Sequence, residues 1–402
     1  MNQMGSVPQF PPPLPPGPLP LPVPASFSGD RGEFRRLVMR GALLELVTVG
    51  FYRFWLATDI RRHLWSHTTV DDDAFEYTGR AKELLIGFLF ALAILVPVYL
   101  AYFLIGLEAE RLKAFASFPL IAFFYLFGQF AIYRARRYRL TRTVWRGVRF
   151  WMDGSGWAYA ARAALWALLM PLTLGLILPW REAALERYKM QHCYYGDLQG
   201  SFDGRGSEFF KRGWWIWLWA IVVLLLPFLT LKVIPAAGSL LMLVAAPFLY
   251  GVFKAVQWRW WISGIRFGDV RLESALLNGA LVGLYWKVIG WFLLVLVLFG
   301  AYLFSCAGLI AGLSQTPIAK VFTPGNLQAN IPMLVLAGIG YLAFILTLNV
   351  VMRVYLLRDL WVRLIDSTTV HGIEAAANVA VAGDLANAIG EGLADGLDVV
   401  GF

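Results

Sequence analysis

Two arginines, Arg62 and Arg187, occupy matching places after a stretch of sequence that occurs twice. The stretch reads TVGFYRFW at residues 48–55 and TLGLILPW at residues 173–180, and each arginine follows the final tryptophan by seven residues. Because a guanidinium group can donate to two phosphate oxygens in parallel, both arginines are candidate ligands for an anionic solute or a lipid headgroup. The alternative is that they are charges that set the orientation in a membrane, and the two roles are compatible.

Other side chains that could do chemistry are few. His63 and His67 would share one face of a helix, as metal ligands can, but no acidic motif of the H-E-x-x-H type accompanies them. We therefore predict no metal site and no cofactor, and we predict no enzyme because no catalytic constellation is found. Glu45 lies within an apolar segment, which makes it a candidate functional residue. Its counterpart in the second stretch is Met170, so we interpret Glu45 as facing water.

The composition is that of a membrane protein. Of the 402 residues, 59% are apolar and 15% are charged, and the mean hydropathy is +0.61, whereas about a quarter of the residues of a soluble domain are charged. We assign the net charge of +9 to basic cytoplasmic loops and expect no nucleic-acid partner. Residues 1–26 are proline-rich and predict a disordered, extended arm. Residues 367–402, rich in alanine and glycine, predict a mobile tail.

Apolar runs long enough to cross a bilayer, about 20 residues, recur along the chain. We predict an all-α polytopic membrane protein with six transmembrane helices in three hairpins and with both termini in the cytoplasm. The stretch Arg134–Phe150 has seven arginines and no acid and is predicted to be a cytoplasmic loop. Gly41–Ala57 and Ala158–Trp180 have basic residues on both sides, so we expect each to be re-entrant or interfacial; the alternative is eight full spans. The six helices are predicted at Leu84–Leu107, Phe118–Tyr133, Trp214–Ile234, Ala236–Val256, Val288–Leu313 and Met333–Met352.

The duplicated stretch belongs to a longer match without gaps at an offset of 125 residues. A shorter pattern, an aromatic residue followed two positions later by Gly and six positions later by Glu, is nested in it. This pattern predicts a turn at which Gly adopts a positive φ, followed by a helix whose first turn holds the acid. We predict three copies of one unit, at residues 27–150, 152–265 and 267–366, with Trp55 and Trp180 as interfacial anchors. The matched motif residues are Trp55 and Trp180, Gly50 and Gly175, Gly79 and Gly204, and Glu83 and Glu208.

These elements resemble a family of bacterial membrane proteins typified by YjgN. The resemblance is carried by TVGFYRFW with Arg61 and Arg62, by FEYTG with Glu83, and by TLGLILPW, and it extends from about Phe27 to Asp366. It implies a location in the bacterial inner membrane. It implies no established activity, and no catalytic residue is carried over.

Two functions from different classes fit these observations. Internal repeats are a common plan of transporters, so we expect a transporter or channel for a small solute. The alternative is a non-transporting membrane scaffold, or a protein that binds anionic lipids, because basic residues and tryptophans suit an anionic cytoplasmic leaflet. A polar path lined by Gln257, Asn278 and Asn349 would favour transport, and a dry centre would favour the alternative. In either case we expect anionic membrane lipids as partners.

Overall fold

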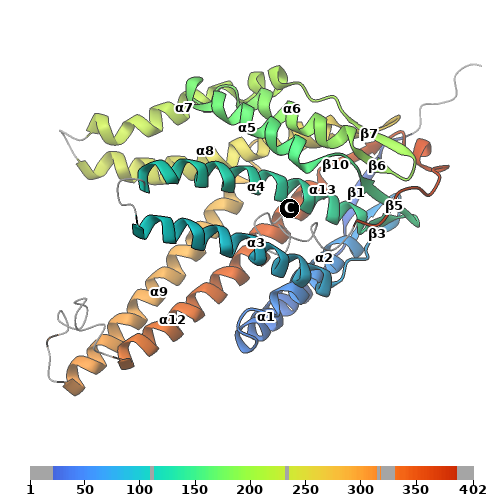
Figure 1. Cartoon of the computed structure of the whole chain (residues 1–402). Helices are drawn as coiled ribbons and strands as arrows, with labels where there is room; N and C mark the ends of the chain where they lie inside the picture. The colour runs from blue at the N-terminus through green and yellow to red at the C-terminus, as the bar shows by residue number, and fades with distance from the viewer. Residues whose placement is uncertain (1–20, 109–112, 231–234, 315–316, 318–330, 387–402) are drawn as a thin grey trace, which may run out of the picture.

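Ten short strands close into an antiparallel barrel at one end of the molecule, so the prediction of an all-α fold is wrong (Figure 1). The computed structural model describes residues 21–108, 113–230, 235–314, 317 and 331–386. Around the barrel the strands follow the order β1-β10-β9-β8-β7-β6-β5-β4-β3-β2, and β2 pairs with β1. The strands are β1 (Val23–Phe27), β2 (Thr68–Val70), β3 (Asp73–Tyr77), β4 (Thr143–Trp145), β5 (Val148–Met152), β6 (Cys193–Tyr195), β7 (Leu198–Phe202), β8 (Ile265–Phe267), β9 (Val270–Ser274) and β10 (Thr368–His371).

Two-residue turns join four of the strand pairs, β2 to β3, β4 to β5, β6 to β7 and β8 to β9. In the first of these turns Asp71 and Asp72 have φ values of 54° and 61°, and in the second Arg146 and Gly147 have φ values of 48° and 75°. Such left-handed turns match the right-handed twist of paired strands and therefore favour tight hairpins. Strands β1 and β10 also pair with each other, but they come from opposite ends of the described chain, so this pairing is not a hairpin and closes the barrel.

The barrel is filled by apolar side chains from strands all around it. Trp145 of β4 and Tyr195 of β6 pack with Val70, Val270 and Val370 from other strands in one buried cluster. The Tyr195 hydroxyl donates to the carbonyl oxygen of Trp145 at 3.0 Å, so its polar atom is satisfied. A short 3-10 helix, η2 (Ile373–Ala376), adds further apolar side chains to the same cluster. The barrel is thus a packed core, and burial of each large side chain stabilises it by roughly 1.5–3 kcal/mol.

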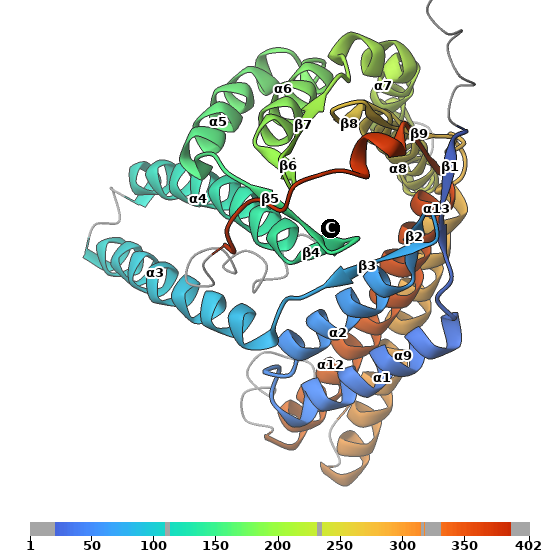
Figure 2. The ribbon, with the colours of Figure 1, turned by 90° about the vertical axis from the view of Figure 1, so that its right-hand side faces the viewer.

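Pairs of helices connect consecutive strand pairs, so the order strand, two helices, strand occurs five times in the described chain. Viewed toward the barrel, the helix pairs surround it (Figure 2). The repeating structural unit is therefore shorter than each of the three copies expected at residues 27–150, 152–265 and 267–366. A duplication of sequence stays a prediction. The helices are α1 (Arg31–Val47), α2 (Arg53–Ser66), α3 (Ala81–Glu108), α4 (Lys113–Thr141), α5 (Gly156–Leu172), α6 (Leu178–Gln191), α7 (Gly206–Thr230), α8 (Pro235–Gly264), α9 (Val282–Ser314), α12 (Ile331–Val351), the π-helix η1 (Met352–Arg358) and α13 (Asp359–Asp366).

Six helical stretches in the described residues are long and apolar enough to cross a membrane, as predicted. They lie at Ala81–Leu104, Phe118–Thr141, Gly206–Thr230, Ala236–Gly264, Val282–Leu313 and Ile331–Asp366. The predicted loop Arg134–Phe150 is corrected, because α4 continues to Thr141 and is followed by β4 and β5. The arginine-rich end of α4 stays helical because several of its side chains find partners on neighbouring elements, as Arg136 does with Glu186.

The two copies of the duplicated stretch, residues 48–55 and 173–180, contain the turns of two short helical hairpins, α1–α2 and α5–α6. These hairpins are not among the six long apolar stretches. In the first turn Val49 and Gly50 have φ values of 53° and 87°, and in the second Leu174 and Gly175 have φ values of 48° and 80°. The Thr48 hydroxyl donates to the carbonyl oxygen of Leu44 at 2.7 Å and accepts from the amide of Tyr52 at 2.9 Å. The Thr-x-Gly signature therefore encodes a reversal of chain direction.

At Gly79 and Gly204 the glycine of the nested pattern serves a purpose different from the predicted one. Positive φ values are found at Gly50 and Gly175, as well as at other turn positions, but not at Gly79 or Gly204. A Cβ atom on Gly79 would lie 2.5 Å from the ring of Tyr77, and one on Gly204 would lie 2.6 Å from the ring of Phe202. Glycine is needed there because the aromatic ring two residues earlier folds over it. The predicted acids do lie in first helical turns, Glu83 in α3 and Glu208 in α7.

The membrane domain extends beyond its predicted limits at both ends. Strand β1 begins at Val23, inside the stretch assigned to the proline-rich arm, and β10 lies inside the stretch assigned to the tail. The predictions for residues 1–20 and 387–402 lie outside the described residues.

Candidate functional site

A groove lies between α7, α8 and the start of α9, and its apolar part has a volume of about 320 Å³. On α7, Trp215, Trp219 and Val223 follow one another at four-residue intervals, so they share one face of the helix. Tryptophan supplies both a large apolar surface and a ring that suits the membrane–water boundary. The lining side chains are Trp215, Trp219, Val223, Val244, Ala245, Phe248, Leu249 and Trp286.

The same faces of α7 and α8 carry two arginines at the end of the groove nearer the barrel. Arg212, Val256, Arg259 and Asn278 line a second hollow of about 310 Å³. Arg212 lies six residues after the start of α7, and Arg259 lies five residues before the end of α8, so both lie one to two helical turns from the barrel. Both are exposed, and neither guanidinium has an ion-pair partner within the described chain. A positively charged hollow therefore lies on the barrel side of the apolar one along the same two helices.

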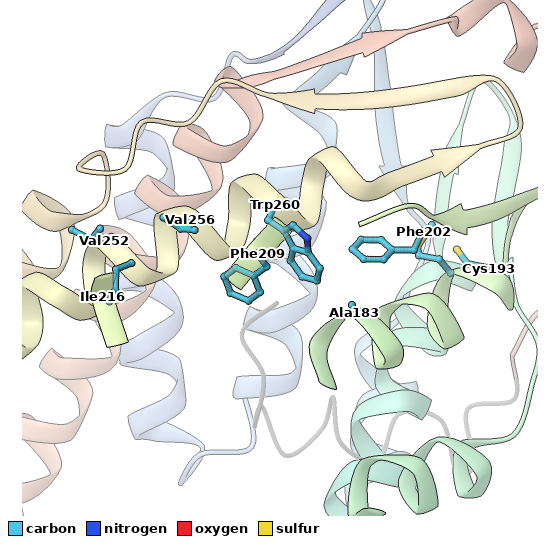
Figure 3. Close-up of a cluster of buried hydrophobic side chains, with 9 residues drawn as sticks. Ala183, Cys193, Phe202, Phe209, Ile216, Val252, Val256 and Trp260 are labelled. Atoms are coloured by element: carbon cyan, nitrogen blue, oxygen red, sulfur yellow. The ribbon is translucent and has the colours of Figure 1, made fainter. Parts of the chain in front are cut away.

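A buried cluster behind the groove fixes the positions of α7 and α8 (Figure 3). Phe209 stacks on Trp260 with ring centroids 4.8 Å apart, and the Trp260 indole donates to the carbonyl oxygen of Arg205 at 3.1 Å. Ile216 and Val252 continue the contact along the two helices. Trp215 and Leu249, which line the apolar hollow, also pack against this cluster, so the cluster holds the two helices in a fixed relative position.

A buried cluster of charges joins α4 to α6 beside this region. The Arg136 guanidinium donates to a Glu186 carboxylate oxygen at 3.0 Å, and Lys189 pairs with the other oxygen. Arg136 also lies over the Trp261 ring of α8, 5.7 Å from its centroid. Burial alone would raise the pKa of Glu186, but Lys189 and Arg136 lower it to about 2. The cluster is therefore held as an ion pair and positions α6 against its neighbours.

The structure does not bring Arg62 and Arg187 together. Arg62 on α2 donates to the carbonyl oxygen of Gly79 at 3.0 Å, which ties the first short hairpin to the turn before α3. Arg187 lies on α6 with its side chain exposed. The two matched arginines therefore have different surroundings, and their predicted role as anion ligands stays a prediction.

The matched tryptophans and acids also have different surroundings. Trp55 stacks on Tyr52 with ring centroids 6.3 Å apart, whereas Trp180 packs against Phe210 of α7 at 5.4 Å. Glu83 accepts hydrogen bonds from the Tyr138 hydroxyl at 2.8 Å and from Arg142 at 3.0 Å. Glu208 is exposed. The role of the two tryptophans as interfacial anchors stays a prediction.

Glu45 does not face water, contrary to its interpretation from the sequence. It is 7% exposed, and both terminal nitrogens of Arg353 donate to one of its carboxylate oxygens at 3.0 Å. Arg353 belongs to the π-helix η1, a widened helical segment of a kind that often marks a special site. The pair therefore joins the first short hairpin to the last long one.

The groove arginines were not singled out from the sequence. Arg212 and Arg259 are separated by 46 intervening residues, and only the antiparallel packing of α7 on α8 places them at one end of a groove. A usable signal was present, because each arginine lies next to clustered tryptophans, in KRGWWIW and QWRWW. Such an arginine at the end of an apolar helix is typical of the headgroup region.

Within the described part of the chain, six helices fit to span a membrane are attached to a ten-strand barrel, and this combination defines the class of the protein. The chain belongs to a bacterial protein family of unknown function, DUF898, whose model matches residues 22–240. The predicted resemblance is thereby confirmed at the level of the family, and the match ends within α8. Comparison with curated proteins and with solved structures finds no significant match.

Proposed function

We propose that the protein binds an anionic phospholipid from the cytoplasmic leaflet of the bacterial inner membrane. The observation that carries this proposal is the presence of two hollows along α7 and α8, one lined by Arg212 and Arg259 and the other, farther from the barrel, lined by apolar and tryptophan side chains. A phosphate group suits the two guanidinium groups, and an acyl chain suits the tryptophan-lined length. From Arg212 to Trp219 the helix rises by roughly 10 Å, a separation that matches a headgroup and the upper part of its chain.

The proposed orientation places the barrel in the cytoplasm. Basic side chains gather near the barrel ends of the long helices, including Arg137 and Arg139 on α4, Lys211 on α7 and Arg363 on α13. Positive charge marks the cytoplasmic side of membrane proteins. Since β1 and β10 both belong to the barrel, the two ends of the described chain lie on that same side, in agreement with cytoplasmic termini.

The short hairpins would enter the bilayer without crossing it. Helix α1 has 17 residues, about 25 Å of helix, whereas the hydrocarbon core is about 30 Å thick. The tips carry exposed apolar residues, with Val49 88% and Leu174 85% exposed, which favours contact with lipid over contact with water. Two re-entrant hairpins and three long ones on one barrel would form a lipid-binding membrane scaffold.

Transport of a small solute remains the second candidate, without a contact in its favour. The amide oxygen of Gln257 accepts from Lys254 at 2.9 Å, and Asn349 donates to the Ile345 carbonyl of its own helix at 3.1 Å. Asn278 instead lines the arginine end of the groove. These three side chains have separate surroundings and do not line one polar path. The barrel interior is also apolar. Both observations favour the alternative to transport, a membrane scaffold that binds anionic lipids.

Native mass spectrometry with added lipid tests the proposal. The detergent-solubilised protein is titrated with phosphatidylglycerol and, separately, with zwitterionic phosphatidylcholine. Each charge-assisted hydrogen bond contributes about 1.5–3 kcal/mol, so Arg212→Ala with Arg259→Ala should weaken binding of phosphatidylglycerol by roughly a hundredfold or more. Phosphatidylcholine carries the same phosphate beside a cationic choline, which the two arginines repel, so it should bind the wild type more weakly and lose less affinity in the variant.

A matched double variant separates this site from general charge. Arg205→Ala with Arg271→Ala removes the same charge from exposed positions outside the groove and should leave binding within about twofold, since exposed charges separated by more than about 10 Å are largely screened. Trp219→Ala should weaken binding, whereas Trp214→Ala, on another face of α7, should not. Equal losses in both double variants, or no preference for the anionic lipid, would reject a groove site.

A further inference from the structure

Three potential metal ligands meet where the first short hairpin joins the barrel. Glu33 lies in the first turn of α1, while His63 lies in the last turn of α2 and His67 caps that helix. The antiparallel hairpin brings these ends side by side, and one ligand atom from each residue lies within 4.8 Å of the other two. The two histidine rings are 4.2 Å apart between centroids.

His63 has a buried nitrogen with no partner in the described chain. The residue is 7% exposed, and its Nε2 atom makes no hydrogen bond. Leaving a buried polar atom unpaired is costly, so such an atom calls for an explanation such as an ion.

His67 is held in the tautomer that metal binding needs. Its Nδ1 atom lies 2.7 Å from the carbonyl oxygen of His63, and a carbonyl can only accept, so Nδ1 carries the proton. The lone pair is then on Nε2. Metal-binding histidines usually donate their other ring N–H to a carbonyl or carboxylate in this way, which fixes the orientation of the ring.

The second short hairpin satisfies the matching positions without an ion. At an offset of 125 residues, Tyr188 replaces His63, Ala158 replaces Glu33, and His192 matches His67. The Tyr188 hydroxyl donates to the Ser155 carbonyl oxygen at 3.0 Å. His192 Nδ1 pairs with the Asp153 carboxylate at 2.7 Å. The first short hairpin therefore has three potential metal ligands and an unpartnered His63 nitrogen, whereas the matching positions of the second short hairpin do not form such a set.

We propose that Glu33, His63 and His67 bind a divalent transition-metal ion of the zinc type. Two imidazoles and one carboxylate are a donor set that such ions accept, with a fourth position left for water. Glu33 is exposed, so the ion has a path from solvent. The ion would join the start of α1 to the end of α2, directly beside β1 and β2, and would hold the hairpin against the seam of the barrel. This site is separate from the lipid groove.

Metal titration of the full, tag-free chain tests this site. The detergent-solubilised protein is stripped with a chelator, and binding of Zn²⁺ is measured by equilibrium dialysis with elemental analysis. Binding of Co²⁺ is measured by its visible absorption. We expect one equivalent of each metal. Glu33→Gln and His67→Ala should each weaken binding at least as much as the loss of an outer-shell partner does, about 10–100-fold.

Two control variants remove equivalent groups elsewhere. Glu208→Gln changes the matching acid in the first turn of α7, and His192→Ala changes the matching histidine of the second hairpin. Both should keep the full metal stoichiometry. The chain has four histidines, so a general histidine effect would appear in both histidine variants. Absence of stoichiometric binding to the wild-type chain, or equal affinity in Glu33→Gln and Glu208→Gln, would overturn the proposal. Glu33→Gln decides the matter if His67→Ala fails to fold, because the Glu33 side chain is exposed.

Discussion

Substitution of Arg353 by methionine tests how the first short hairpin is held to the last long one. The Glu45 and Arg353 side chains are 8% and 13% exposed, and the two guanidinium nitrogens at 3.0 Å donate to the same carboxylate oxygen. Arg353→Met leaves a buried carboxylate without its partner. Breaking a buried pair from one side costs about 3–5 kcal/mol, or two to three and a half powers of ten in the unfolding equilibrium constant.

The free energy of unfolding can be measured by titration with a denaturing detergent in mixed micelles. The double variant Glu45→Met with Arg353→Met should recover most of the loss, because apolar residues of similar volume can replace a buried ion pair with little net cost. A double-mutant cycle then gives the coupling energy of the pair.

An ion pair with an exposed arginine provides the control, because its acid, Asp359, keeps Arg358 as a second partner at 3.3 Å when the first is removed. Arg31 pairs with Asp359 at 2.6 Å, and the Arg31 side chain is 43% exposed, so Arg31→Met should cost about 1 kcal/mol or less. If Arg353→Met costs no more than Arg31→Met, the Glu45 pair is hydrated and the reasoning from burial is refuted. A double variant no more stable than Arg353→Met alone would show that packing, and not charge, holds the hairpin.

Three further perturbations test separate contacts. Gly79→Ala places a Cβ atom 2.5 Å from the Tyr77 ring and should cost about 1–3 kcal/mol by overpacking, seen as a lower midpoint of thermal unfolding; no change would mean that the ring moves aside freely. Gly50→Ala meets no atom within 4 Å but has a φ of 87°, so it should cost about 1–2 kcal/mol from backbone strain alone, and an unchanged midpoint would refute that strain. The Glu186 pKa of about 2 lies below its ordinary value of 4.5, so this carboxylate stabilises the fold above pH 4.5, and about 3 kcal/mol should be lost as the pH falls toward 2. Glu186→Gln should flatten this part of the stability profile, measured by denaturation at a series of pH values, and an equally steep profile in the variant would contradict the assignment.

Hydropathy identified the membrane helices because their signal is local. Each predicted span overlaps one of the six long apolar helices of the structure. The end of α4 was misplaced because its arginines were treated as a loop, whereas Arg136 and Arg142 are paired with Glu186 and Glu83. Such pairings lie between elements and cannot be read from a run of residues along one helix.

The barrel was missed because its strands are only three to five residues long. Periodicity is weak over so few residues, but the turns were visible in the sequence. The segments WRGV, YGDL and FGDV each place a two-residue turn between apolar or aromatic residues, and VDDDA places one between Val70 and Asp73; such turns are a hairpin signal. Taken together, four such signals between helical pairs indicate a sheet that runs through the whole chain.

The proposed metal site and the proposed lipid groove differ in how many of their residues could be identified from the sequence. His63 and His67 were found from their spacing, but Glu33 lies 30 residues earlier and joins them only through the α1–α2 hairpin. Arg212 and Arg259 come from opposite ends of a longer hairpin. In both cases the residue types were visible and the tertiary partner was not, because a helical hairpin brings together residues that are far apart in sequence.

Closure of the barrel by β1 and β10 constrains the order in which the protein assembles. Val23 pairs with Val370, so the ring cannot close until nearly the whole chain has left the ribosome. The four hairpins with two-residue turns are local and can form as soon as their two strands have been synthesised, because short loops close at low entropic cost. Until β10 is synthesised, one edge of β1 has no partner strand, and β10 then has to pair with that edge. Closure is thus a non-local step of the slow kind, and a chain truncated before β10 would present open strand edges to other proteins.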